Sequence, residues 1–132
     1  MDDTIVHFEI PAEDVEKLTN FYEKLFGWKT KRTEVGVPPE SDYRLVETVP
    51  TDEEGNPVRN GVNGAIFKRQ DADTRFTYCV QVESVDEYSR KIEELDGKIS
   101  ESKVEVPSVG WVAFALDPEG NPFGMFEAMP RE

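Results

Sequence analysis

An internal duplication is the feature that most constrains the fold of this chain. A strand-like segment, an amphipathic helix and a closing glycine occur twice, and equivalent residues lie 70 positions apart. The aligned pairs are Asp14 and Ser84, Val15 and Val85, Leu18 and Tyr88, Tyr22 and Ile92, Leu25 and Leu95, and Gly27 and Gly97. A second motif, Asp-x-Glu-Gly-Asn-Pro, begins at Asp52 and again at Asp117. Repeated supersecondary units predict two modules of the same fold.

Hydrophobic periodicity predicts a β-α-β-β-β order in each half. In the first half we expect a strand over Thr4–Ile10 that ends at Pro11, and a helix over Val15–Phe26 between an Asp14 N-cap and Gly27. Further strands are expected at Trp28–Glu34, Tyr43–Val49 and Gly61–Lys68. A polar connector, Gln70–Thr74, separates the halves.

The same order is expected in the second half. A capping box of Ser84 and Glu87 predicts a helix start, and Gly97 is expected to end that helix. Strands are expected at Arg75–Val82, Lys98–Val106, Gly110–Leu116 and Pro122–Ala128. We therefore expect a single α+β domain over 1–132, made of tandem βαβββ modules at about 1–69 and 75–132.

Strand alternation assigns the two faces of the predicted sheet. The helix-facing residues should be Val6, Phe8 and Ile10 in one half and Tyr78, Val80 and Val82 in the other. The opposite face then carries His7 and Glu9, and Thr77, Cys79 and Gln81. Half a chain buries little apolar surface alone, so we expect both halves to share one open, curved, mixed sheet with the helices outside. The polar face of that sheet either lines a pocket for a small molecule or is simply solvated.

Composition excludes several classes of partner. The net charge of −13 repels phosphate backbones, so we expect neither nucleic acid nor an anionic membrane as a partner. No apolar run is long enough to span a bilayer, and no leader pattern precedes the first strand, so a cytoplasmic protein is expected. Cys79 is the single cysteine, which excludes an internal disulfide and a cysteine-rich zinc site.

Three segments resemble the vicinal oxygen chelate superfamily, which includes glyoxalase I, extradiol dioxygenases and bleomycin resistance proteins. They are HFEIPAEDVEKLTNFYEKLFGW, FTYCVQVESVDEYSRKIEELDGK and GWVAFALDPEGNPFGMFEA. The closest likeness is to short glyoxalase-like members of mostly unassigned activity. The resemblance implies paired βαβββ modules around a pocket, and homodimers are common among such chains.

The resemblance also implies metal-ligand positions, and only His7 matches one of them. The equivalent position in the second half is Thr77, the fourth-strand candidates are Asn63, Gly64 and Ala65, and the position after the last turn is Gly124. Threonine and glycine are poor ligands. Glu127 lies three residues beyond Gly124, so strand parity should point it to the other face. We therefore expect no tightly bound metal, with a divalent ion (Zn, Ni, Mn or Fe) as the alternative.

These observations favour a protein that binds a small molecule near His7 without the full metal site of the family. His7 and Glu9 are the candidates for acid–base work. The candidate ligand contacts are His7, Glu9, Gly64, Thr77, Cys79, Gly124 and Phe126. A metal-dependent lyase, isomerase or dioxygenase of the same fold is one alternative, and a non-catalytic interaction module is another.

Overall fold

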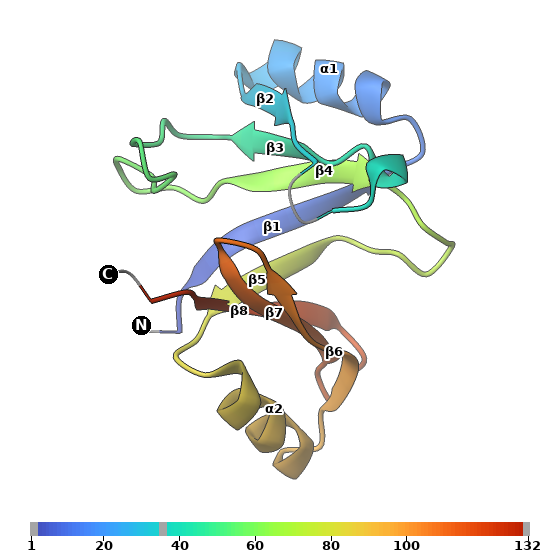
Figure 1. Ribbon diagram of the computed structural model, residues 1–132. Helices are drawn as coiled ribbons and strands as arrows, with labels where there is room; N and C mark the ends of the chain where they lie inside the picture. Colours follow the sequence, from blue (N-terminus) through green and yellow to red (C-terminus); the bar gives the residue numbers. More distant parts are fainter. Residues whose placement is uncertain (1–2, 35–36, 131–132) are drawn as a thin grey trace. The chain divides into compact units, whose positions relative to one another are not determined.

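The computed structural model describes residues 3–34 and 37–130, and within them it contains two helices and eight strands (Figure 1). The chain divides into two compact units. The first is His7–Phe76, and the second runs from Thr77 onward together with the residues before His7. The predicted α+β class is confirmed. No helix of the described ranges is both long and apolar enough to cross a bilayer.

The first unit contains one helix, one short 3-10 turn and four strands. Its elements are β1 (Ile5–Ala12), α1 (Val15–Phe26), β2 (Lys29–Arg32), the 3-10 turn Pro39–Ser41, β3 (Arg44–Glu47) and β4 (Gly64–Lys68). The strand order is β2-β3-β4-β1. β1 and β4 are parallel, and the other two pairs are antiparallel.

The second unit repeats this arrangement. Its elements are β5 (Thr77–Gln81), α2 (Val85–Glu94), β6 (Lys98–Val106), β7 (Gly110–Leu116) and β8 (Pro122–Ala128). The strand order is β5-β8-β7-β6, with β5 and β8 parallel and the other pairs antiparallel. The strand after each helix therefore occupies the outer position in both units, as expected of a duplicated module.

The repeated Asp-x-Glu-Gly-Asn-Pro motif folds the same way at both sites. The Asp52 side chain accepts hydrogen bonds from the backbone N–H groups of Glu54 and Asn56, at 2.9 and 3.0 Å. Asp117 accepts from Glu119 and Asn121, both at 2.9 Å. An aspartate side chain that bonds the backbone two residues on stabilises a tight turn. These turn hydrogen bonds lower the pKa of Asp117.

Both helices begin at the predicted caps. Asp14 accepts from the Lys17 N–H at 3.0 Å, and Ser84 accepts from the Glu87 N–H at 3.1 Å. Gly27 ends α1 in the left-handed region, with φ of 75°. The prediction for the end of α2 was wrong, because Asp96 takes the left-handed conformation, with φ of 72°.

Each helix covers the sheet face that alternation assigned to it. Phe8 and Ile10 of β1 pack on a buried cluster of Ala12, Val15, Val46 and Ile66. Val80 of β5 and Val82, which directly follows that strand, belong to the equivalent cluster around Val85, Ala113 and Met125. Tyr78 stacks on Phe123, which packs against the same cluster, with ring centroids 6.1 Å apart, and it is 36% exposed at the margin of this face.

Several predicted strand ends differ from the structure. The predicted bounds of β6, β7 and β8 are confirmed, whereas β2, β3, β4 and β5 are each three residues shorter than expected, because pairing with a neighbour, and not alternation, decides where a strand ends. β1 instead extends past its expected end, since it continues through Pro11 to Ala12. Alternate residues of a strand bond to a given parallel neighbour, and Ala12 does so here by accepting from the Arg69 N–H at 2.8 Å. Pro11 therefore removes no hydrogen bond to β4.

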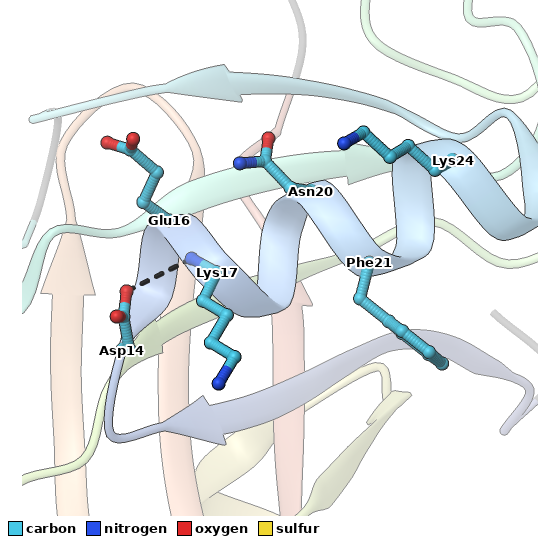
Figure 2. A pocket seen from close by; sticks show the side chains of 6 residues that line it. All are labelled: Asp14, Glu16, Lys17, Asn20, Phe21 and Lys24. Carbon is cyan, nitrogen blue, oxygen red and sulfur yellow. Dashed lines mark hydrogen bonds between the residues drawn. The ribbon is translucent and has the colours of Figure 1, made fainter.

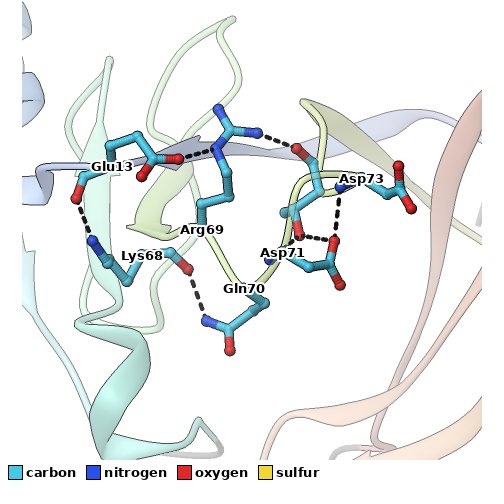
Figure 3. A network of polar contacts seen from close by, with 7 residues as sticks. Glu13, Lys68, Arg69, Gln70, Asp71 and Asp73 are labelled. Atoms are coloured by element: carbon cyan, nitrogen blue, oxygen red, sulfur yellow. Dashed lines mark hydrogen bonds and ion pairs between the residues drawn. The ribbon is translucent and has the colours of Figure 1, made fainter.

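The polar connector after β4 is held by charged side chains (Figure 3). Arg69 pairs with Glu13 at 2.9 Å and also donates to the Thr74 carbonyl, while Lys68 donates to the Glu13 carbonyl. The Asp71 carboxylate accepts from the Asp73 N–H at 2.9 Å. The connector is thus tied to the segment between β1 and α1, which explains how a polar, exposed stretch has a defined path.

Candidate functional site

His7 and Glu9 lie on the face of β1 that α1 does not cover. The alternating residues Phe8 and Ile10 pack in the α1 core, so His7 and Glu9 point to the opposite face as predicted. Both side chains are partly exposed, by 28% for His7 and 19% for Glu9. They are therefore accessible to solvent without being fully hydrated.

Tyr43 joins these two residues into one hydrogen-bonded cluster. Its hydroxyl donates to Glu9 Oε2 at 2.5 Å and lies 3.1 Å from His7 Nε2. His7 Nε2 and Glu9 Oε2 are 3.5 Å apart. We refer to His7, Glu9 and Tyr43 as the β1–β3 polar cluster.

The direction of these hydrogen bonds sets the state of the imidazole. Because the Tyr43 proton goes to Glu9, the Tyr43 oxygen can only accept from His7, so Nε2 carries a proton. In a neutral imidazole the other nitrogen is then a free acceptor. No partner for His7 Nδ1 is present in the part of the chain that the structure describes. The cluster therefore offers the lone pair of His7 Nδ1 as a hydrogen-bond acceptor, while the Glu9 carboxylate lies close to Nε2.

The cluster also keeps Glu9 ionised. Burial acts to raise the pKa of the Glu9 carboxyl, but the hydrogen bonds from His7 and Tyr43 and the attraction of His7 together outweigh it. The pKa of Glu9 is therefore lowered from its ordinary value of 4.5. Glu9 is therefore an ionised carboxylate whose Oε2 lies 3.5 Å from His7 Nε2.

Sequence reasoning missed Tyr43. The expected strand Tyr43–Val49 contained it, but its partners lie 34 and 36 positions earlier in the chain. The connection arises because β3 pairs with β4 and β4 with β1, placing Tyr43 on the same face as Glu9. Tyr43 also lies beside Phe67, with ring centroids 6.2 Å apart. The only sequence signal for Tyr43 was its place at the start of an expected strand.

The three candidate ligand positions on or beside the fourth strand have structural roles in strand pairing, packing and backbone hydrogen bonding. Ala65 pairs with Glu9 in the β1–β4 register and is fully buried. Gly64 permits close packing, since a Cβ there would lie 2.3 Å from the Phe8 carbonyl oxygen. Asn63 accepts from the N–H groups of Thr48 and Val49, at 2.7 and 3.0 Å, which occupies its amide oxygen.

The second-unit candidates lie close together on β5 and β8. Cys79 pairs with Gly124, and Gln81 pairs with Phe126. Cys79 is 5% exposed, as expected of a small buried residue. A Cβ at Gly124 would lie 2.7 Å from the Cys79 sulfur and 2.9 Å from the Phe114 ring, so these side chains fill the space above the glycine. Thr77 begins β5, and the role of these residues in ligand binding stays a prediction.

Glu127 lies on the α2 side of its unit, as parity predicted. Its Oε1 accepts from the Val85 N–H at 2.9 Å, at the first turn of α2. A carboxylate there satisfies a helix N–H and complements the helix dipole. Glu127 therefore has a structural role in this unit.

The donor set does not fit the metal site of the resembled family. Within residues 3–34 and 37–130 no three His, Cys, Asp or Glu side chains gather where they could share an ion. His7 Nε2 is engaged by Tyr43, and the Asn63 oxygen by the β3–β4 loop. Protein sites for divalent transition metals use three or more donors. A metal-free site stays a prediction, and no chemistry is derived through an ion here.

A separate hollow lies on the exposed side of α1 (Figure 2). It is lined by Asp14, Glu16, Lys17, Asn20, Phe21 and Lys24. Asp14 already caps the helix, and the charged side chains of Glu16, Lys17 and Lys24 are exposed. His7 does not line this hollow, so the predicted pocket beside His7 is a different place and stays a prediction.

The comparisons with known proteins agree on the fold. Residues 4–125 match the model of the Glyoxalase/Bleomycin resistance protein/Dioxygenase superfamily, and no curated protein matches the chain. A hypothetical protein from Bacillus halodurans C-125 has a TM-score of 0.72 at 12% identity, over 100% of this chain and 99% of the other.

Two similar structures are methylmalonyl-CoA epimerases. The Mycobacterium tuberculosis enzyme has a TM-score of 0.68 at 12% identity, over 96% of this chain and 88% of its own. A Streptomyces coelicolor variant in complex with 2-nitronate-propionyl-CoA has a TM-score of 0.70 at 14% identity, over 97% and 99% of the two chains. Such identities show a shared fold and not a shared activity. With its duplicated modules and the match over residues 4–125, the chain belongs to the Glyoxalase/Bleomycin resistance protein/Dioxygenase superfamily.

Proposed function

We propose that this protein binds a small molecule at the β1–β3 polar cluster, without the metal site of the family. The observation that carries the proposal is the unpartnered Nδ1 of His7, held in one tautomer by Tyr43 and Glu9. A ligand with an O–H, N–H or acidic C–H group can donate to this nitrogen. The ionised Glu9 would then stabilise a proton shared with His7.

The surroundings of the cluster support a ligand that also has an apolar part. In the β3–β4 register Leu45 pairs with Ala65, which itself pairs with Glu9, so Leu45 lies on the same face as the cluster. Leu45 is 41% exposed, and the Tyr43–Phe67 pair lies beside it along the neighbouring strands. A structurally similar epimerase is known in complex with methylmalonyl-CoA. This compound combines an acidic C–H group with an apolar part, so it belongs among the first to be tested.

The single histidine permits a direct test. Protein labelled with 15N-histidine gives signals from one imidazole, whose two nitrogens report the tautomer and any new hydrogen bond. We expect the Nε2–H tautomer in the free protein, and a shift of the Nδ1 signal when a set of acyl-CoA thioesters and small hydroxy and keto acids is added. An Nδ1–H tautomer would contradict the assigned geometry, and unchanged signals with every compound would contradict binding at this site.

Matched tyrosine variants separate the site from general effects. Tyr43→Phe removes the hydroxyl that orients His7 and should weaken any ligand-induced shift. Tyr78→Phe removes a hydroxyl from the second unit and keeps the ring that stacks on Phe123, so the shift should persist. Equal loss in both variants would mean that the signal reports folding and not binding.

The metal-dependent alternative makes a different prediction. Elemental analysis of the purified protein would then find stoichiometric Zn, Ni, Mn or Fe that is lost in His7→Ala. We further propose a cytoplasmic homodimer, on the basis of the family resemblance. Light scattering that gives a monomer mass at micromolar concentration would contradict the dimer.

A further inference from the structure

Two Asn-Gly pairs, Asn60-Gly61 and Asn63-Gly64, lie three residues apart in the first unit. We propose that Asn60 is a site of spontaneous deamidation and that the fold protects Asn63. In this reaction the backbone nitrogen of the next residue loses its proton and attacks the asparagine Cγ, and ammonia leaves. Water then opens the resulting succinimide at either carbonyl, giving aspartate or isoaspartate. Glycine favours the attack because it lacks a side chain and its backbone is free to rotate.

Sequence removes two of the five asparagines from consideration, and helix α1 removes a third. Asn56 and Asn121 precede proline, whose nitrogen carries no proton and cannot close the ring. Asn20 precedes Phe21 in the middle of α1, where the helix holds the backbone and the bulky side chain hinders the attack. Only the two Asn-Gly pairs remain, and their sequence context is the same at the reacting atoms.

The two Asn-Gly pairs have different surroundings in the structure. Asn63 is fixed at both ends of its amide: the oxygen accepts from the Thr48 and Val49 N–H groups, and the nitrogen donates to the Val49 carbonyl at 3.2 Å. The next residue, Gly64, is buried and begins β4. Attack at Asn63 therefore requires these bonds and the strand end to open together.

Asn60 has none of these restraints. It is exposed in the loop before β4, and its amide has no hydrogen-bond partner in the described part of the chain. Gly61 lies outside every strand, and among the described residues its N–H donates to no backbone carbonyl. Rotation of this peptide therefore breaks no backbone hydrogen bond of the described residues, and its close contact is with the Val49 side chain, whose Cγ1 would lie 2.4 Å from a Cβ at Gly61. The product adds one negative charge to a chain whose net charge is already −13.

The two pairs can be measured in one peptide. The folded protein is incubated at mildly alkaline pH and physiological temperature, and samples are digested with a lysine-specific protease. The peptide Arg32–Lys68 contains Asn56, Asn60 and Asn63, so tandem mass spectrometry assigns the amide-to-carboxyl mass change to one of them. We expect deamidation at Asn60 to be faster than at Asn63 by at least about tenfold, given the hydrogen bonds that Asn63 must break.

Two controls make the outcome decisive. In concentrated urea both asparagines should react at similar rates, because only the fold distinguishes them. In Asn60→Gln the acidic isoform that accumulates on an anion-exchange column should disappear, since glutamine closes a ring far more slowly. Equal rates in the folded protein, an Asn60 as inert as Asn63, or an acidic isoform that persists in Asn60→Gln would each overturn the proposal.

Discussion

Replacing Tyr43 with phenylalanine should destabilise the first unit by removing the hydroxyl at the centre of the β1–β3 polar cluster. In the wild type this hydroxyl donates to an ionised carboxylate at 2.5 Å and contacts His7 at 3.1 Å. A hydrogen bond to a charged group contributes about 1.5–3 kcal/mol when buried. Glu9 is 19% exposed, so water replaces part of the lost bond. We expect a loss of about 1–2 kcal/mol in the free energy of unfolding at neutral pH.

The pH dependence follows from the lowered pKa of Glu9. A carboxyl whose pKa is lower in the folded state contributes stability above its unfolded pKa, and this contribution is lost as the pH falls through the folded pKa. Tyr43→Phe removes one of the hydrogen bonds that lower this pKa. The difference between wild type and variant should therefore be largest at neutral pH and shrink as the pH falls below the ordinary carboxyl value of 4.5.

Urea denaturation can report this unit selectively. Trp28 stacks on Tyr22 at 4.9 Å in the first unit, so its fluorescence in a Trp111→Phe background follows unfolding there. Tyr78→Phe is the control and should change stability by less than about 0.5 kcal/mol. If Tyr43→Phe is as stable as the wild type at neutral pH, or if its effect does not vary with pH, the hydroxyl does not stabilise an ionised Glu9.

Three further predictions concern packing, capping and metal. Gly64→Ala should lower the free energy of unfolding by about 1–3 kcal/mol in urea titrations, because the new Cβ lies 2.3 Å from the Phe8 carbonyl oxygen; unchanged stability would refute the close packing. Glu127→Ala should lower the free energy of unfolding by about 1 kcal/mol, because it leaves the Val85 N–H without its acceptor. Glu127→Gln keeps an oxygen acceptor and should retain most of that stability. Calorimetry that finds both variants equally stable would contradict this. If the site is metal-free, removal of divalent ions with EDTA should leave the midpoint of thermal unfolding unchanged. A midpoint that falls with EDTA and is restored by one added metal would contradict a metal-free site.

Much of the fold was predictable because its signals are local. Caps, glycine ends and 3.6-residue periodicity act over a few residues, so Asp14, Ser84 and the two helices could be located from the sequence. Strand parity likewise placed His7 and Glu9 opposite the core and Glu127 on the α2 side. The duplicated turn motif adopts the hydrogen bonds of an aspartate turn at both sites for the same local reason.

The candidate site depended on contacts that no local pattern contains. Tyr43 reaches Glu9 only because β4 lies between β3 and β1, and this pairing fixes which residues meet across strands. The same strand pairing and loop bonding make Asn63 different from Asn60, although each precedes a glycine. The sequence by itself determined the repeated modules and the polar face of β1. The tertiary structure alone decided which distant side chain completes that face, because strand register brings together residues that lie far apart in the chain.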